Sequence, residues 1–105
     1  MKTVVITGST RGLGFEMAKR FRLNGLNVVV NGVNRERLND AVAKLRGEPG
    51  IGAVEGFAGS VASEIDIDAL MAFGREKFGT VDIWINNAGV NQPMKAIWEI
   101  GRAHV

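Results

Sequence analysis

The chain has 105 residues, 46% of them hydrophobic and 23% charged, with no cysteine and a formal net charge of +2. This composition predicts one globular domain over residues 1–105 and excludes disulfides and cysteine-ligated metal sites. Basic residues alternate with acidic ones, so the charge pattern does not favour a nucleic-acid-binding surface.

The first predicted elements are a strand and an amphipathic helix. Residues 2–7 form a β-branched run typical of a buried parallel strand. A helix is predicted from about Gly12 to Asn24, where asparagine precedes a glycine that favours helix termination. Leu13, Met17 and Phe21 recur at a spacing of four, which predicts that they form the packing stripe of this helix.

Strands and helices continue to alternate along the rest of the chain. The pattern predicts a doubly wound parallel α/β sheet of the Rossmann type, with strand order 3-2-1-4 in its first half. The fourth strand would then be an apolar edge that invites pairing with another chain. Residues 94–100 carry a short helical pattern, and residues 101–105 show no periodicity. The remaining predicted elements are a strand at 26–30, a helix capped by Asn34, a strand at 51–57, a helix from Ser63 to Gly79 and a strand at 81–85.

A glycine-rich turn joins the first strand to the first helix. Glycines in such a turn let the backbone approach a diphosphate, and the first N–H groups of the helix point at its charge. Tight packing is the alternative explanation, since neither the GxGxxG spacing nor a phosphate-loop lysine is present. In the binding interpretation Gly8, Gly12 and Gly14 admit the diphosphate and the helix packing, while Ser9, Thr10 and Arg11 line the turn and bind phosphate or ribose oxygens.

The spacing Thr7-Gly8-x-x-x-Gly12-x-Gly14, with Leu13 inside it, resembles the TGxxxGxG fingerprint of the short-chain dehydrogenase/reductase family. A second motif of that family, Asn86-Asn87-Ala88-Gly89, stands at the end of the fourth predicted strand. The resemblance implies an oxidoreductase that transfers hydride between a nicotinamide dinucleotide and a carbonyl or alcohol. It implies that Thr7 ties the turn to the fourth strand and that Asn87 stabilises that strand. Ala88 and Gly89 would pass close to the adenosine ribose.

The residues of both motifs, at 8–14 and 82–89, are also similar to those of the chlorophyll(ide) b reductase-like branch of the family.

The end of the second strand bears on which dinucleotide is bound. In NAD-selective relatives an acidic side chain there accepts hydrogen bonds from the adenosine 2′-hydroxyl. The stretch from Asn31 to Arg35 contains no acid, and both of these residues are candidate contacts. Arg11 and Arg35 supply positive charge for a 2′-phosphate, whereas Arg37 is equally well explained as a solvated helix residue. The sequence therefore predicts NADP(H) in preference to NAD(H).

Two departures from the family pattern concern the adenine contact and catalysis. Relatives place an aspartate after the third strand; here Ser60 stands there, followed by Val61, whose N–H is available to the adenine. The family's catalytic Tyr-x-x-x-Lys pair is missing because the chain contains no tyrosine. We therefore predict no catalytic residue, no metal site, and a cofactor-binding domain that is incomplete at its C-terminus.

Three functions agree with these observations. The chain is a truncated oxidoreductase that is inactive alone, a non-catalytic nucleotide-binding or regulatory module, or a subunit completed by a second chain through the fourth strand. No apolar run reaches membrane-spanning length and the first residues do not resemble a signal peptide, so we expect a cytoplasmic protein that does not bind membranes.

Overall fold

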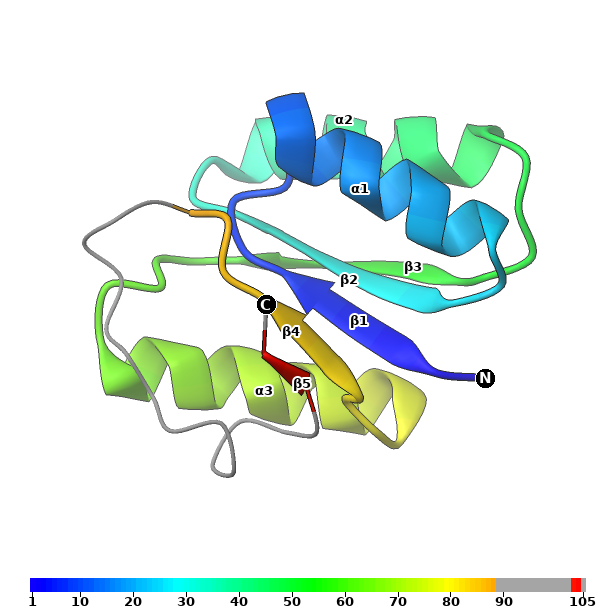
Figure 1. Ribbon diagram of the computed structural model, residues 1–105. Helices are drawn as coiled ribbons and strands as arrows, with labels where there is room; N and C mark the ends of the chain where they lie inside the picture. Colours follow the sequence, from blue (N-terminus) through cyan, green and yellow to red (C-terminus); the bar gives the residue numbers. More distant parts are fainter. Residues whose placement is uncertain (89–102, 105) are drawn as a thin grey trace.

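The computed structural model describes residues 1–88 and 103–104, and Figure 1 shows strands and helices alternating along them. Gly89 and the predicted helical pattern at 94–100 lie outside the described residues. The elements are β1 (Thr3–Ile6), α1 (Gly12–Leu23), β2 (Asn27–Gly32), α2 (Arg35–Gly47), β3 (Val54–Ala58), α3 (Glu64–Phe78), β4 (Ile83–Ile85) and β5 (Ala103–His104).

The strands form one parallel sheet in the order β3-β2-β1-β4-β5. The predicted order 3-2-1-4 and the doubly wound arrangement are confirmed. The prediction that β4 is the edge is wrong, because Ala103 and His104 pair with Ile83 and Trp84 on its outer side. Residues 101–105 carry no periodicity from which this pairing could be predicted, since a strand of two residues is too short to have one.

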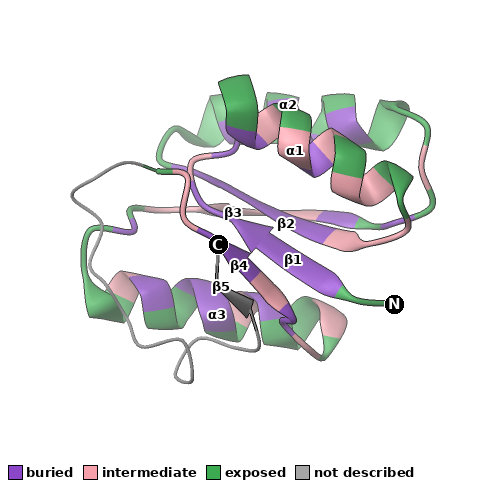
Figure 2. Ribbon diagram, viewed as in Figure 1, coloured by how far each residue is buried: buried purple, intermediate pink, exposed green. Residues whose placement is uncertain are grey.

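Helices cover both faces of the sheet, as Figure 1 shows: α1 and α2 lie on one face and α3 on the other. Alternate residues of β1 serve the two layers, with Val4 and Ile6 packed on the α1–α2 side and Val5 on the α3 side. Trp84 is 1% exposed and packs in the α3 layer. Figure 2 shows β1 and most of β2 as buried, which explains their continuous apolar runs.

Local capping signals in the sequence place the helix ends. Asn34 accepts a hydrogen bond from the Arg37 N–H at 2.9 Å, which caps α2. The Ser63 hydroxyl accepts one from the Asp66 N–H at 3.2 Å and caps α3. Gly79 ends α3 with φ +81°, a left-handed conformation that glycine adopts without strain.

The third strand begins later than predicted. Residues 51–53 form a bend because side chains of other elements bind their backbone: Arg22 Nε donates to the Gly52 carbonyl at 2.7 Å and Asn27 Oδ1 accepts from the Ala53 N–H at 3.1 Å. A Cβ at Gly52 would lie 1.8 Å from the Leu26 carbonyl oxygen. The apolar run at 51–57 therefore contains a bend and then a strand.

The packing stripe of α1 also differs from the prediction. Gly14 and Ala18 are its buried residues, Met17 and Phe21 are half-buried, and Leu13 is 69% exposed. Successive helical residues are about 100° apart, so a helix that turns Gly14 toward the sheet turns Leu13 away from it. Small residues at the contact let α1 approach the sheet closely. The spacing of the large apolar residues does not predict this face.

Candidate functional site

A cleft of about 520 Å³ opens at the carboxyl ends of β1, β2 and β4. The cleft lies where the strand order reverses, because β1 stands between β2 on one side and β4 on the other. In open α/β sheets this switch point is where ligands bind. The cleft is lined by Gly8, Thr10, Arg11, Gly32, Val33, Asn34, Arg37, Asn87 and Ala88.

The floor of the cleft is the turn between β1 and α1. Gly8 and Gly12 have φ values of +58° and +61°, which side chains rarely adopt. A Cβ at Gly8 would also lie 2.9 Å from the Ala88 Cα. Glycine at position 8 therefore permits both the turn and the close approach of the segment that follows β4.

Gly14 is required by packing rather than by its backbone conformation. An added Cβ would lie 2.6 Å from Asn87 Nδ2 and 2.8 Å from the Gly8 carbonyl oxygen. These two atoms are joined by a hydrogen bond of 2.9 Å, in which Asn87 donates. The start of α1 is therefore packed directly against the contact that joins the turn to the segment after β4.

Thr7 makes the second link between these segments. Its hydroxyl oxygen accepts hydrogen bonds from the N–H groups of Asn87 at 2.9 Å and Ala88 at 3.0 Å, and its side chain is fully buried. The hydroxyl also contacts the Ile85 carbonyl at 3.4 Å. This is the arrangement that the family resemblance implies for Thr7.

Ser9 and Asn31 point into the protein rather than into the cleft. Ser9 is fully buried, and its hydroxyl donates to the Ile6 carbonyl at 2.7 Å and accepts from the Asn31 N–H at 2.9 Å. Asn31 is 2% exposed. Both residues shape the turn from behind, whereas Thr10 and Arg11 line the cleft itself.

The N-terminus of α1 differs from those of α2 and α3. Asn34 and Ser63 cap α2 and α3, and each of these helices has an acidic residue in its first turn. The N-cap of α1 is Arg11, which makes no side-chain capping hydrogen bond, and its first turn has no acid. A helix N-terminus carries partial positive charge, and neither the N-cap nor the first turn of α1 supplies a side chain that compensates it.

The basic residues beside the cleft are Arg11 and Arg37, not Arg35. Within residues 1–88, neither guanidinium makes an ion pair or hydrogen bond. Arg35 is exposed and lies outside the lining. A sequence signal for Arg37 exists: it stands three residues after the Asn34 cap, in the first turn of α2, which lies beside the cleft.

Ser60 and Val61 follow β3 at the same end of the sheet, without lining the cleft. The Ser60 side chain is exposed, and its hydroxyl accepts a hydrogen bond from the Ala62 N–H at 3.0 Å. Val61 is 8% exposed and packs in the α3 layer.

No group of three or more histidine, cysteine, aspartate or glutamate side chains gathers among the described residues in a way that could hold a metal ion. The helices described are also too short or too polar to cross a membrane.

The family model for short chain dehydrogenase matches residues 2–103. The chain belongs to this family. It is 46% identical over 88 residues to chlorophyll(ide) b reductase NOL of Oryza sativa subsp. japonica, which covers 84% of this chain and 26% of the rice protein. It is 43% identical over 89 residues to 3beta-hydroxysteroid dehydrogenase 1 of Eggerthella lenta, which covers 85% of this chain and 34% of that protein. The similarity to the chlorophyll(ide) b reductase branch is thereby confirmed.

Solved structures of the family share this fold. The crystal structure of L-sorbose reductase from Gluconobacter frateurii, complexed with NADPH and L-sorbose, superposes with a TM-score of 0.78 at 36% identity. The match covers 85% of this chain and 34% of the reductase. The chain thus spans about a quarter to a third of the length of these relatives, and the part it spans contains the cleft at the switch point.

Proposed function

We propose that the cleft binds NADP(H) and that the chain is the cofactor-holding part of a short-chain dehydrogenase/reductase. The observation that carries this proposal is the conjunction of the glycine turn with a helix N-terminus that no side chain caps. A diphosphate fits such a turn because it accepts the free N–H groups and compensates the partial positive charge. The NADPH in the matched L-sorbose reductase structure supports the same class of ligand.

The preference for a 2′-phosphate rests on charge. The cleft is lined by Arg11 and Arg37, and its described lining contains no carboxylate. A cation at a helix N-cap is opposed by the helix dipole, so Arg11 is destabilising unless an anion binds beside it. A phosphate between two guanidiniums satisfies both. An adenosine 2′-hydroxyl offers neither charge nor a second acceptor oxygen.

The remaining contacts follow from position along the sheet edge. Gly8, Thr10 and the N–H groups of Gly12, Leu13 and Gly14 would hold the diphosphate. Asn87, Ala88 and Gly89 would border the ribose, and Ser60 with Val61 would border the adenine. Ser9 and Asn31 would support these contacts without touching the dinucleotide. Arg35 is replaced by Arg37 in this assignment.

A bound nicotinamide dinucleotide supplies hydride chemistry toward a carbonyl or alcohol. The described residues bind and orient it, and they include no tyrosine to move the substrate proton. We therefore propose that this chain binds the cofactor but does not turn over a carbonyl substrate by itself.

Titration with NADPH and NADH, followed by energy transfer from tryptophan to the nicotinamide, tests the proposal. Arg11→Gln should weaken NADPH about tenfold, because it removes a charged hydrogen bond, and should weaken NADH less. Arg20→Gln, in the same helix and outside the cleft, should change neither affinity. Equal losses for both cofactors would contradict the NADP(H) assignment, and no binding by the unaltered chain would contradict the site.

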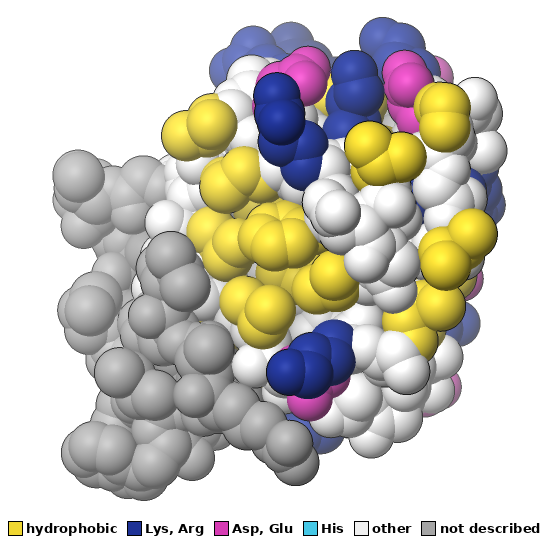
Figure 3. Space-filling model, turned by 45° about the vertical axis from the view of Figure 1, so that its right-hand side comes forward, with side chains coloured by type: hydrophobic (Ala, Val, Ile, Leu, Met, Phe, Trp, Pro, Cys, Tyr) yellow, Lys and Arg dark blue, Asp and Glu magenta, His cyan; other side chains and the backbone are white. Residues whose placement is uncertain are grey.

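A second candidate function, a subunit completed by another chain, is favoured by one surface. Figure 3 shows hydrophobic side chains gathered on one face of the molecule, with basic and acidic side chains above and below them. The α1–α2 layer includes Met17, Phe21 and Ile83, which stay only half-buried. Apolar patches on such a face mark interfaces. Because β5 covers the outer side of β4, we place the contact on this face rather than on the β4 edge.

The oligomeric state tests this candidate. A complemented or self-associated protein should have at least twice the monomer mass in sedimentation, and Ile83→Lys should return it to the monomer. A monomer that binds NADPH at all protein concentrations would contradict the interface and leave the cofactor site standing.

A further inference from the structure

Asn31 joins three strand ends through one side chain. Its Oδ1 accepts the N–H of Gly8 at 3.1 Å, in the turn after β1. Its Nδ2 donates to the carbonyls of Phe57 at 3.1 Å and Gly59 at 3.0 Å, at the end of β3. The amide thereby links the segment that precedes α1 to the segment that leads to Ser60.

Backbone bonds reinforce this link. The Ser9 N–H donates to the Asn31 carbonyl at 2.8 Å, while the Asn31 N–H donates to the Ser9 hydroxyl at 2.9 Å. The Gly59 N–H donates to the Gly32 carbonyl at 3.0 Å. Hydrogen bonding between neighbouring chain segments thus continues beyond the sheet and into the two loops.

Only an amide in this position satisfies all of these groups. A carboxylate keeps an acceptor for Gly8 but turns its second oxygen toward the carbonyls of Phe57 and Gly59. An apolar side chain leaves one N–H and two carbonyls, all partly buried, without that partner. Asn31 itself does not line the cleft, so any effect on a ligand passes through Gly8 and Gly59.

We propose that Asn31 is a positioning residue that fixes the spacing between the diphosphate-binding turn and the adenine-binding loop. The inference rests on the proposed function, because those two segments matter together only for a ligand that spans them. A dinucleotide bridges both segments, and its affinity depends on their being held at a matching distance. A ligand that occupies only the adenine side does not depend on that distance.

The test compares NADPH with adenosine, which lacks both the diphosphate and the 2′-phosphate assigned to Arg11 in the turn, on Asn31→Ala. NADPH affinity should fall about tenfold, as expected for a displaced hydrogen-bonding segment, while adenosine affinity stays within about twofold. Asn27→Ala is the matched control, because Asn27 links β2 to the segment before β3 at the opposite end, through the Ala53 N–H. It should lower the melting temperature and leave both affinities unchanged.

Hydrogen exchange of the unaltered protein gives a measurement that does not depend on the variant folding. The Gly8 and Gly59 amides should open together, and NADPH should slow both by the same factor. Independent exchange, or equal losses of NADPH and adenosine affinity in Asn31→Ala, would overturn the positioning role. If the unaltered chain fails to bind NADPH, the proposed function fails first.

Discussion

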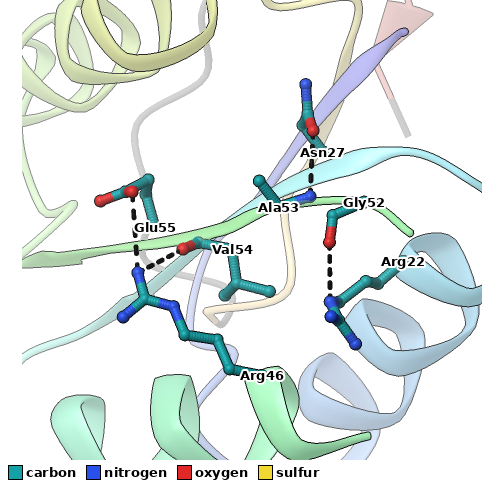
Figure 4. A network of polar contacts seen from close by, with 7 residues as sticks. All are labelled: Arg22, Asn27, Arg46, Gly52, Ala53, Val54 and Glu55. Carbon is teal, nitrogen blue, oxygen red and sulfur yellow. Dashed lines mark hydrogen bonds and ion pairs between the residues drawn. The ribbon is translucent and has the colours of Figure 1, made fainter. Parts of the chain in front are cut away.

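The two ends of the parallel sheet differ in whether their arginine side chains are bound by the rest of the protein. At the amino end, two arginines form hydrogen bonds and an ion pair with groups of the same chain, as Figure 4 shows. Arg22 binds the carbonyls of Gly52 and Glu48, and Arg46 binds the Val54 carbonyl at 2.7 Å and the Glu55 carboxylate at 3.6 Å. At the carboxyl end, Arg11 and Arg37 have no such partner within the described residues.

The two buried threonines of the β1 region show the reverse contrast. Thr3 and Thr7 stand at the two ends of the β1 region and are both fully buried. The Thr7 hydroxyl accepts two backbone N–H groups, whereas the Thr3 hydroxyl has no partner among the described residues. At the amino end the arginine charges are bound within the protein, whereas the carboxyl end combines a hydrogen-bonded backbone with two arginines that have no partner among the described residues. That combination is what a binding site for an anion requires.

The largest effect is expected from Gly14→Ala. The added Cβ meets Asn87, Gly8 and Ser9 within 2.9 Å, and backbone atoms among these cannot move aside cheaply. We expect about 3 kcal/mol lower unfolding free energy and loss of NADPH binding. Gly47→Ala, in the last turn of α2 with nothing within 4 Å, is the control. Urea unfolding and cofactor titration measure both, and equal behaviour of the two variants would contradict the packing argument.

Next is the threonine pair. Thr7→Val leaves the Asn87 and Ala88 N–H groups without an acceptor and should cost about 2 kcal/mol of unfolding free energy. Thr3→Val removes a hydroxyl without a partner and should be neutral or stabilising. Chemical denaturation of both variants checks the sign, and a destabilised Thr3→Val would show that the two ends are equally dependent on their hydroxyls.

A smaller effect distinguishes the two arginines at the start of α2. Arg37→Gln should weaken NADPH about tenfold, because Arg37 lines the cleft, while Arg35→Gln should change it less than about twofold. Calorimetric titration measures both variants at the same ionic strength. The reverse ranking would restore Arg35 as the phosphate contact.

The smallest effect is expected at the amino end. Arg46→Gln loses one hydrogen bond and one ion pair, both partly exposed, and should lower the unfolding free energy by about 1 kcal/mol. NADPH affinity should not change, because Arg46 is remote from the cleft. A binding defect in this variant would contradict the separation of the two ends.

Much of the fold was predictable because its signals are local. β-Branched runs, the Asn34 and Ser63 caps and the Gly79 stop each depend on a few neighbouring residues, and they placed most elements correctly. The exception at 51–53 arose because Arg22 and Asn27, from other elements, bind that backbone. The site was predictable to the level of its turn, since Gly8 and Gly14 belong to a motif of fixed spacing.

The order of strands and helices, the glycine turn and the family all follow from patterns of neighbouring residues. Other features became visible only in the folded protein: Leu13 faces outward, Ser9 and Asn31 face inward, Arg37 rather than Arg35 borders the cleft, and residues 103–104 lie beside β4. The physical reason is that each of these outcomes depends on which distant segment packs against the residue, and on the room left there. The spacing of residues along the chain predicts where a side chain points only when the residues packed around it are also close in sequence.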